Sequence, residues 1–87
     1  MPTVRRSTVR HPKFSASLEA IAANDPTAEA AIEGAIWEIE HAPSSHGVYD
    51  ERIDAWHAKL ILPSRTEVML YYGINRRFVM TLAIREV

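Results

Sequence analysis

The sequence predicts a small α+β domain in which an N-terminal strand and a helical hairpin pack on an antiparallel β-sheet. Three observations support this fold class. Apolar residues recur at helical spacing through the first half of the chain, and they alternate with other residues through the second half. A segment rich in Pro, Ser and Gly separates the two halves. A length of 87 residues suits one domain, so we treat 1–87 as a single unit.

The first half opens with a strand and a helix. Residues 3–10 are rich in Thr and Val and alternate weakly, which is typical of a short edge strand. Pro12 suits the first turn of a helix. The apolar stripe of that helix comprises Phe14, Leu18, Ile21 and Ala22.

A second helix follows after a tight link, so that the two form a hairpin. We expect Asp25 to cap this helix, with Pro26 at its first position. Pro43 ends the helix after His41. Its apolar stripe comprises Ala28, Ile32, Ala35, Ile36 and Ile39. Residues 43–51 are then expected to form a loop.

Three strands are predicted at 53–62, 67–74 and 78–86, and the short turns between them indicate an antiparallel meander. Matching the apolar faces fixes the register, because a slip of one residue would bury the other face. The expected pairs are Trp56 with Tyr72, Leu60 with Val68, Ile74 with Phe78, Tyr72 with Met80, Leu70 with Leu82, and Val68 with Ile84.

The opposite face of this sheet is the expected location of function. It is predicted to carry His57, Lys59, Glu67, Met69, Tyr71, Thr81 and Arg85. In the expected register His57, Tyr71 and Thr81 form one cross-strand row, and Glu67 and Arg85 form another. An ion pair between Glu67 and Arg85 would leave that arginine a structural role, whereas a free Arg85 can stabilise a phosphate.

Charge is distributed unevenly, although the net charge is only −1. Residues 1–24 carry four Lys or Arg and one Glu, residues 25–51 carry seven Asp or Glu and no Lys or Arg, and residues 52–87 carry six Lys or Arg and three Asp or Glu. The two basic ends provide the charge that nucleic-acid binding needs. A solvated acidic helix, or an acidic helix that contacts another protein, is the alternative interpretation.

Several classes of protein are excluded or disfavoured. The chain has no cysteine, which excludes disulfides and thiolate metal sites. The four histidines show no metal-ligand spacing, so no metal and no cofactor is expected. There is no apolar run long enough for a transmembrane helix and no secretory leader, so no membrane association and a cytoplasmic location are expected.

The chain resembles the RelE/ParE toxin superfamily in nearly its whole length. "VRHPKFSASLEAIA" is similar to the opening strand and first helix of that family, and "IDAWHAKLILPSRTEVMLYYGINRRFVMTLAIREV" is similar to its terminal sheet. The resemblance implies the toxin component of a type II toxin–antitoxin system. A RelE-like member would be a metal-independent endonuclease that cuts mRNA on the ribosome. The alternatives are a ParE-like inhibitor of DNA gyrase or a catalytically inactive, protein-binding relative.

The resemblance also suggests site residues and partners. Trp56, His57 and Lys59 match the aromatic–basic strand of the family, and Tyr71 or Tyr72 matches its central tyrosine. The expected catalytic residues are His57, Tyr71 and Arg85, and the expected RNA-binding residues are Lys59, Arg76 and Arg77. The implied partners are a cognate antitoxin, the ribosome with its mRNA or else gyrase, and a second copy of the chain.

Overall fold

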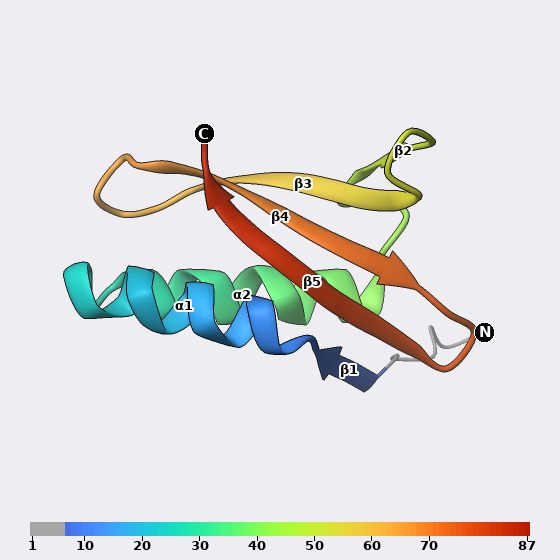
Figure 1. Cartoon of the computed structure of the whole chain (residues 1–87), viewed down its shortest axis with the longest axis horizontal. Coiled ribbons are helices and arrows are strands. Elements are labelled where there is room, and N and C mark those ends of the chain that lie inside the picture. The colour runs from blue at the N-terminus through green and yellow to red at the C-terminus, as the bar shows by residue number, and fades with distance from the viewer. Residues whose placement is uncertain (1–6) are drawn as a thin grey trace.

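The computed structural model describes residues 7–87, and it has the α+β architecture that the sequence predicts. An N-terminal strand and two helices pack on one sheet (Figure 1). The elements in chain order are β1 (Ser7–Arg10), α1 (Pro12–Asn24), α2 (Ala28–His41), β2 (Val48–Asp50), β3 (Ala55–Ile61), β4 (Glu67–Ile74) and β5 (Phe78–Glu86). The part of the expected first strand at 3–6 lies outside the described residues.

The sheet has five strands in the order β1-β5-β4-β3-β2, and it is mixed rather than purely antiparallel. The predicted antiparallel meander of β3, β4 and β5 is confirmed. β1 adds to the edge of β5 in parallel orientation. β2, which falls within the expected loop 43–51, pairs antiparallel with β3 and forms the other edge, so the prediction of a loop was wrong for residues 48–50.

Local chemistry explains where the helices begin and end. Pro12 is the first residue of α1, as predicted, and the ring nitrogen Nδ1 of His11 accepts a hydrogen bond from the backbone N–H of Lys13. The predicted start of α2 is wrong by two residues, because Thr27 occupies the N-cap position and the helix begins at Ala28. Asp25 instead accepts hydrogen bonds from the backbone N–H and the hydroxyl of Thr27. Within residues 7–87, neither helix is both long and apolar enough to cross a bilayer.

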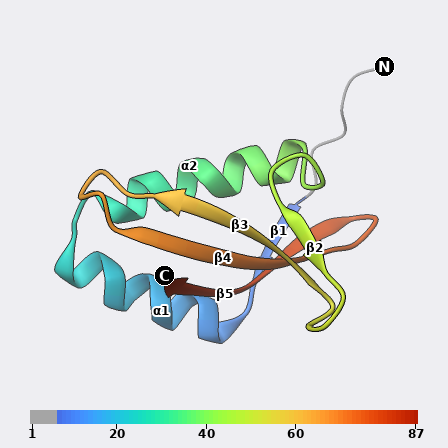
Figure 2. The ribbon, with the colours of Figure 1, turned by 90° about the horizontal axis from the view of Figure 1, so that it is seen from above.

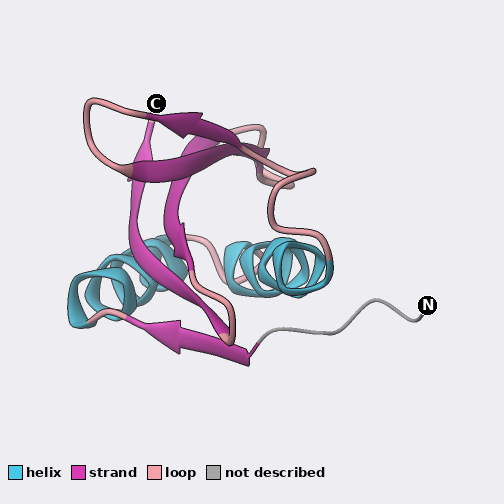
Figure 3. Cartoon of the chain, turned by 90° about the vertical axis from the view of Figure 1, so that its right-hand side faces the viewer, coloured by secondary structure: helices cyan, strands magenta, loops and turns pink. Residues whose placement is uncertain are grey.

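Both helices lie on the same side of β3 and β4 and run in opposite directions (Figures 1 and 2). Seen from the side, both helices lie between the level of β3 and the level of β1 (Figure 3). The predicted stripes supply the core from the helical side. The buried cluster comprises Phe14, Leu18, Ala28, Ile32, Ile36, Ile39, Leu62, Val68, Leu70, Tyr72, Val79 and Ile84.

A β-bulge in β5 overturns half of the predicted register. The pairing of β3 with β4 is as expected, with Trp56 opposite Tyr72 and Leu60 opposite Val68. Between β4 and β5, however, Tyr71 faces Ala83 and Tyr72 faces Thr81, which leaves Leu82 as an extra residue without a partner in β4. The observed pairs are therefore Ile74 with Val79, Tyr72 with Thr81, Leu70 with Ile84, and Val68 with Glu86, in place of the four expected ones.

The loop between α2 and β2 is fixed to the core through Tyr72. The buried Tyr72 hydroxyl donates a 2.7 Å hydrogen bond to the carbonyl oxygen of Pro43, and burial raises the pKa of Tyr72 to about 12. Gly47 passes so close that a β-carbon there would collide with the Tyr72 hydroxyl and lie 2.8 Å from the carbonyl oxygen of His57. The small size of Gly47 therefore lets the loop reach the edge of β3.

The substitution Gly47→Ala is expected to lower the free energy of unfolding by about 1–3 kcal/mol, as overpacking does. Gly34→Ala is the matched control, because open space surrounds Gly34 on α2 and alanine is the better helix former. The control should be neutral or stabilising by up to about 1 kcal/mol. Urea unfolding followed by circular dichroism measures both changes. Equal stability of the two variants would contradict the close approach at Gly47.

Candidate functional site

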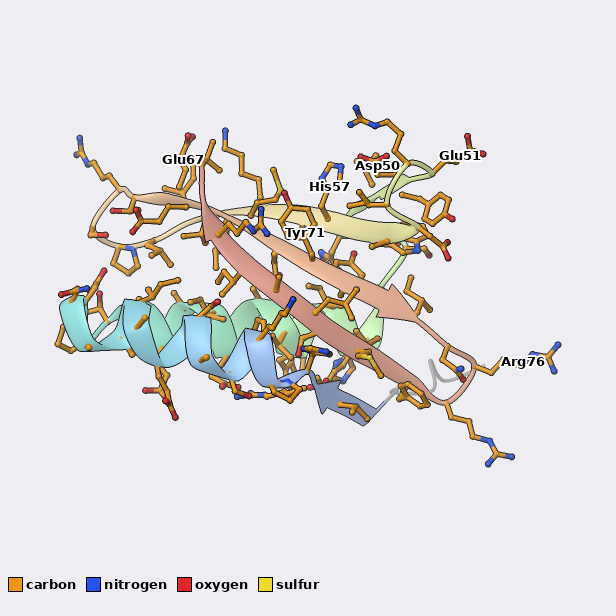
Figure 4. All side chains as sticks on the ribbon, in the orientation of Figure 1. Asp50, Glu51, His57, Glu67, Tyr71 and Arg76 are labelled. Atoms are coloured by element: carbon orange, nitrogen blue, oxygen red, sulfur yellow. The ribbon has the colours of Figure 1, made fainter. Side chains whose placement is uncertain are left out.

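The face of the sheet that points away from the helices is called here the open face. It carries all three predicted catalytic residues, because strand alternation brings His57 and Tyr71 opposite each other and places Arg85 opposite Met69. Figure 4 shows His57, Tyr71 and Glu67 projecting from this side. Thr81, expected on this face, is instead fully buried on the helical side, because the bulge reverses the alternation beyond it.

One cavity on the open face brings the three predicted catalytic residues together. Its volume is about 510 Å³, which is sufficient for a nucleotide-sized ligand. Its walls come from the β2–β3 hairpin, from β4 and from the region of the bulge in β5. The lining residues are Asp50, Arg52, Ile53, Ala55, His57, Met69, Tyr71, Leu82, Ala83 and Arg85.

His57 and Tyr71 form an aromatic pair across β3 and β4. Their ring centroids are 6.3 Å apart and the ring planes are tilted by 58°. Both side chains are half-buried, so each presents part of its surface to the cavity. Such a pair offers a titratable nitrogen next to an aromatic surface on which a nucleobase can stack.

Arg85 supplies positive charge to the same cavity. The expected pair of Arg85 with Glu67 was wrong, because the bulge places Arg85 beside Met69 and the carboxylate of Glu67 lies 2.9 Å from the Nζ of Lys59. Among residues 7–87, no carboxylate lies within ion-pair distance of Arg85. Its exposed guanidinium is therefore available to an anionic ligand.

Asp50 is the acidic group of the cavity, and Arg52 holds it in place. One oxygen of Asp50 accepts hydrogen bonds from the backbone N–H and the Nε–H of Arg52, at 3.0 and 3.3 Å, and the other accepts from the guanidinium at 3.1 Å. These bonds hold the pKa of the Asp50 carboxyl below its usual value. At neutral pH the cavity therefore contains a fixed carboxylate as well as cationic groups.

The turn that presents Asp50 and Arg52 has its own support. Asp54 adopts a positive φ of 49°, a conformation that aspartate tolerates better than most residues. Its carboxylate accepts a hydrogen bond from the hydroxyl of Tyr49, which raises the pKa of that phenol. Tyr49 also contacts Trp56 across the hairpin, with ring centroids 5.7 Å apart. These contacts fix the geometry of the β2–β3 hairpin.

The three predicted RNA-binding residues lie outside this cavity. Lys59 is in the neighbouring row of the open face, where it pairs with Glu67 and lines a shallower hollow next to His57. Arg76 and Arg77 are exposed in the turn between β4 and β5 (Figure 4). The backbone N–H of Arg77 donates to the side chain of Asn75 in that turn.

Sequence reasoning missed Asp50 and Arg52, because Asp50 falls near the end of the segment 43–51 expected to be a loop and Arg52 lies between that loop and the strand expected at 53–62. The signal that could have identified them is the alternation of Val48, Tyr49 and Asp50 immediately before a turn. Three residues are too few to predict a strand from periodicity alone. Pairing with β3 is what orders them.

A larger cavity of about 610 Å³ lies between the end of α1 and the turn from β3 to β4. Its titratable groups are Asp25 and Glu86, and it contains no histidine or cation. The smaller cavity on the open face is therefore the better site for chemistry on an anionic substrate. Within residues 7–87, no three His, Asp or Glu side chains gather in a way that could hold a metal ion.

Comparisons with family models, with curated proteins and with solved structures found no significant match for this chain.

Proposed function

We propose that this protein is the RelE-like toxin of a type II toxin–antitoxin system and cleaves mRNA on the ribosome without a metal ion. The observation that carries the proposal is the convergence of His57, Tyr71 and Arg85 on one cavity of the open face. The three side chains combine a titratable imidazole, an aromatic surface and a cation that is free of ion pairs with residues 7–87. This combination suits a single-stranded RNA substrate.

The proposed reaction is an internal transfer at a phosphodiester. His57 takes the proton of the ribose 2′-OH, and the resulting oxygen attacks the adjacent phosphorus. The bond from phosphorus to the 5′ oxygen breaks, and that oxygen leaves with a proton from solvent. The products are a 2′,3′-cyclic phosphate and a 5′-hydroxyl. Arg85 stabilises the negative charge that develops on the phosphate, and Tyr71 stacks on a neighbouring base.

A second candidate is a protein-binding relative of the same fold, such as a ParE-like gyrase inhibitor. Exposed apolar residues on the open face favour this alternative. Ile61 and Val87 flank Glu67 at one end of that face, with 63% and 72% of their surface exposed, and Val48 beside His57 is 63% exposed. Apolar groups exposed on a sheet face are typical of a surface that another protein covers. A cognate antitoxin is the partner expected under either proposal.

The double substitution Tyr71→Ala with Arg85→Ala is expected to abolish growth arrest in cells that express the protein. Both side chains are at least partly exposed, so the variant should fold as the wild type does, which circular dichroism checks. Mapping of mRNA 5′ ends during expression measures cleavage. Wild-type expression should create new ends, and the double variant should create none.

The remaining outcomes separate the two candidates. Arrest by the wild type without new mRNA ends would contradict the nuclease and support a protein target such as gyrase. Absence of arrest would contradict both toxin proposals and leave a non-toxic binding protein of this fold.

A further inference from the structure

Asp50 lies beside His57 on the open face. In the β2–β3 hairpin Val48 pairs with His57 and Asp50 pairs with Ala55, so Asp50 is the diagonal neighbour of His57 on the same face. Such diagonal neighbours lie roughly 7–8 Å apart between their backbones, within reach of longer side chains. Figure 4 shows the imidazole between Tyr71 and Asp50. Both residues line the cavity of the candidate site.

The contacts of Asp50 leave it able to act on His57. Arg52 donates twice to one carboxylate oxygen and once to the other. A carboxylate has about four acceptor positions, so one remains on the less occupied oxygen. The Asp50 side chain is only 19% exposed, whereas that of Arg52 is 88% exposed. Arg52 therefore approaches from the solvent side and leaves the carboxylate within the cavity.

The charged and titratable groups around this pair are few. The causes that lower the pKa of Asp50 are first the hydrogen bonds from Arg52, and then the positive charges of Arg52 and His57. Glu51 is exposed, and it points away from the cavity in Figure 4. Arg85 lines the cavity with Asp50 and His57.

We propose that Asp50 is a positioning residue that acts through His57: the carboxylate, oriented by Arg52 on the same face and in the same cavity, stabilises through space the positive charge that the imidazole carries after it has taken a proton. The inference deepens the proposed function, on which its catalytic part rests. A carboxylate at this place stabilises the imidazolium that general-base catalysis creates, without itself touching the RNA. Asp50 is thus the residue through which the β2–β3 hairpin contributes to the proposed reaction.

Kinetics test the catalytic part. Asp50→Asn is expected to lower kcat for a short single-stranded RNA by at least about tenfold, with little change in KM. Glu51→Gln removes the same charge from the adjacent position and should leave kcat unchanged. In a His57→Gln background, Asp50→Asn should have no further effect on kcat, because the residue acts through His57. Additive losses, or a loss confined to KM, would overturn the positioning role.

NMR tests the pair without any reaction. The pKa of the Asp50 carboxyl, followed by carbon chemical shift, is expected to rise in His57→Gln, because a positive neighbour is removed. It should stay unchanged in His46→Gln, where the histidine lost is an exposed loop residue. An unchanged value in both variants would refute the inference even if the protein cleaves RNA. If the pKa of Asp50 rises in His57→Gln but the wild type does not cleave RNA, the nuclease is refuted and the interaction between Asp50 and His57 is still supported.

Discussion

His57→Gln is expected to reduce RNA cleavage by about 10²–10⁴-fold, the contribution that a general acid or base typically makes. Glutamine keeps a polar side chain of similar reach, but it cannot take a proton from the 2′-OH near neutral pH. The Tyr71 surface and the Arg85 charge remain, so RNA binding should change little. The rate of cleavage of a fluorescent single-stranded RNA, followed on purified ribosomes, measures the loss.

His46→Gln is the matched control for this experiment. His46 is exposed in the loop before β2, and it does not line the 510 Å³ cavity that His57 shares with Tyr71 and Arg85, although it lines the shallower hollow on the other side of His57. Its replacement should leave the cleavage rate within about twofold of the wild type, because His46 is exposed and is none of the three residues proposed for the chemistry. Equal rates for His57→Gln and wild type would remove His57 from the chemistry and, with it, the proposed mechanism.

Leu70→Ala is expected to lower the free energy of unfolding by about 2–5 kcal/mol, because Leu70 is 1% exposed in the core. Leu82→Ala should lower it by less than about 1.5 kcal/mol, because Leu82 is half-buried at the rim of the open-face cavity. The sequence alone predicts that these two leucines are paired in the core, so the comparison tests the bulge directly. Urea unfolding with an unchanged m value measures both.

Either of two results would contradict the bulge at Leu82. A loss at Leu82 as large as that at Leu70 would place Leu82 in the core and restore the register expected from sequence. A small loss at Leu70 would mean that β4 presents its other face to the helices.

The helices and the β3–β4 pair could be predicted because their patterns are unambiguous. The apolar residues of α2, from Ala28 to Ile39, lie on one side of the helix. Trp56 and Leu60 lie on one face of β3, and a slip of one residue would expose that face. The last strand differs, because apolar residues occupy both of its alternating sets. Phe78, Met80 and Leu82 are larger, so they are the natural choice for the core. Val79 and the fully buried Thr81 take that place instead.

The site was predictable where strand alternation determines it and not elsewhere. His57 and Tyr71 share the open face in any register that buries Trp56 and Tyr72, and in the observed register they lie opposite each other. Arg85 was expected on this face, but its neighbours depend on the bulge, which leaves no local signal in the sequence. The position of Asp50 depends on tertiary contacts that local sequence does not reveal. Gly47 lets the loop before β2 lie against Tyr72 and β3, and this packing allows β2 to pair with β3.

The extra residue in β5 also bears on which lengths of chain this fold can accept. In a strand of regular alternation, removal of one residue exchanges inner and outer faces for everything beyond it. β5 contains one residue in excess of its partner strand, namely Leu82. A chain that lacked this residue would join Thr81 to Ala83 and recover plain alternation, with Ile84 still inward and Arg85 still outward. Related sequences can therefore differ in length by one residue at this point and keep the same two faces.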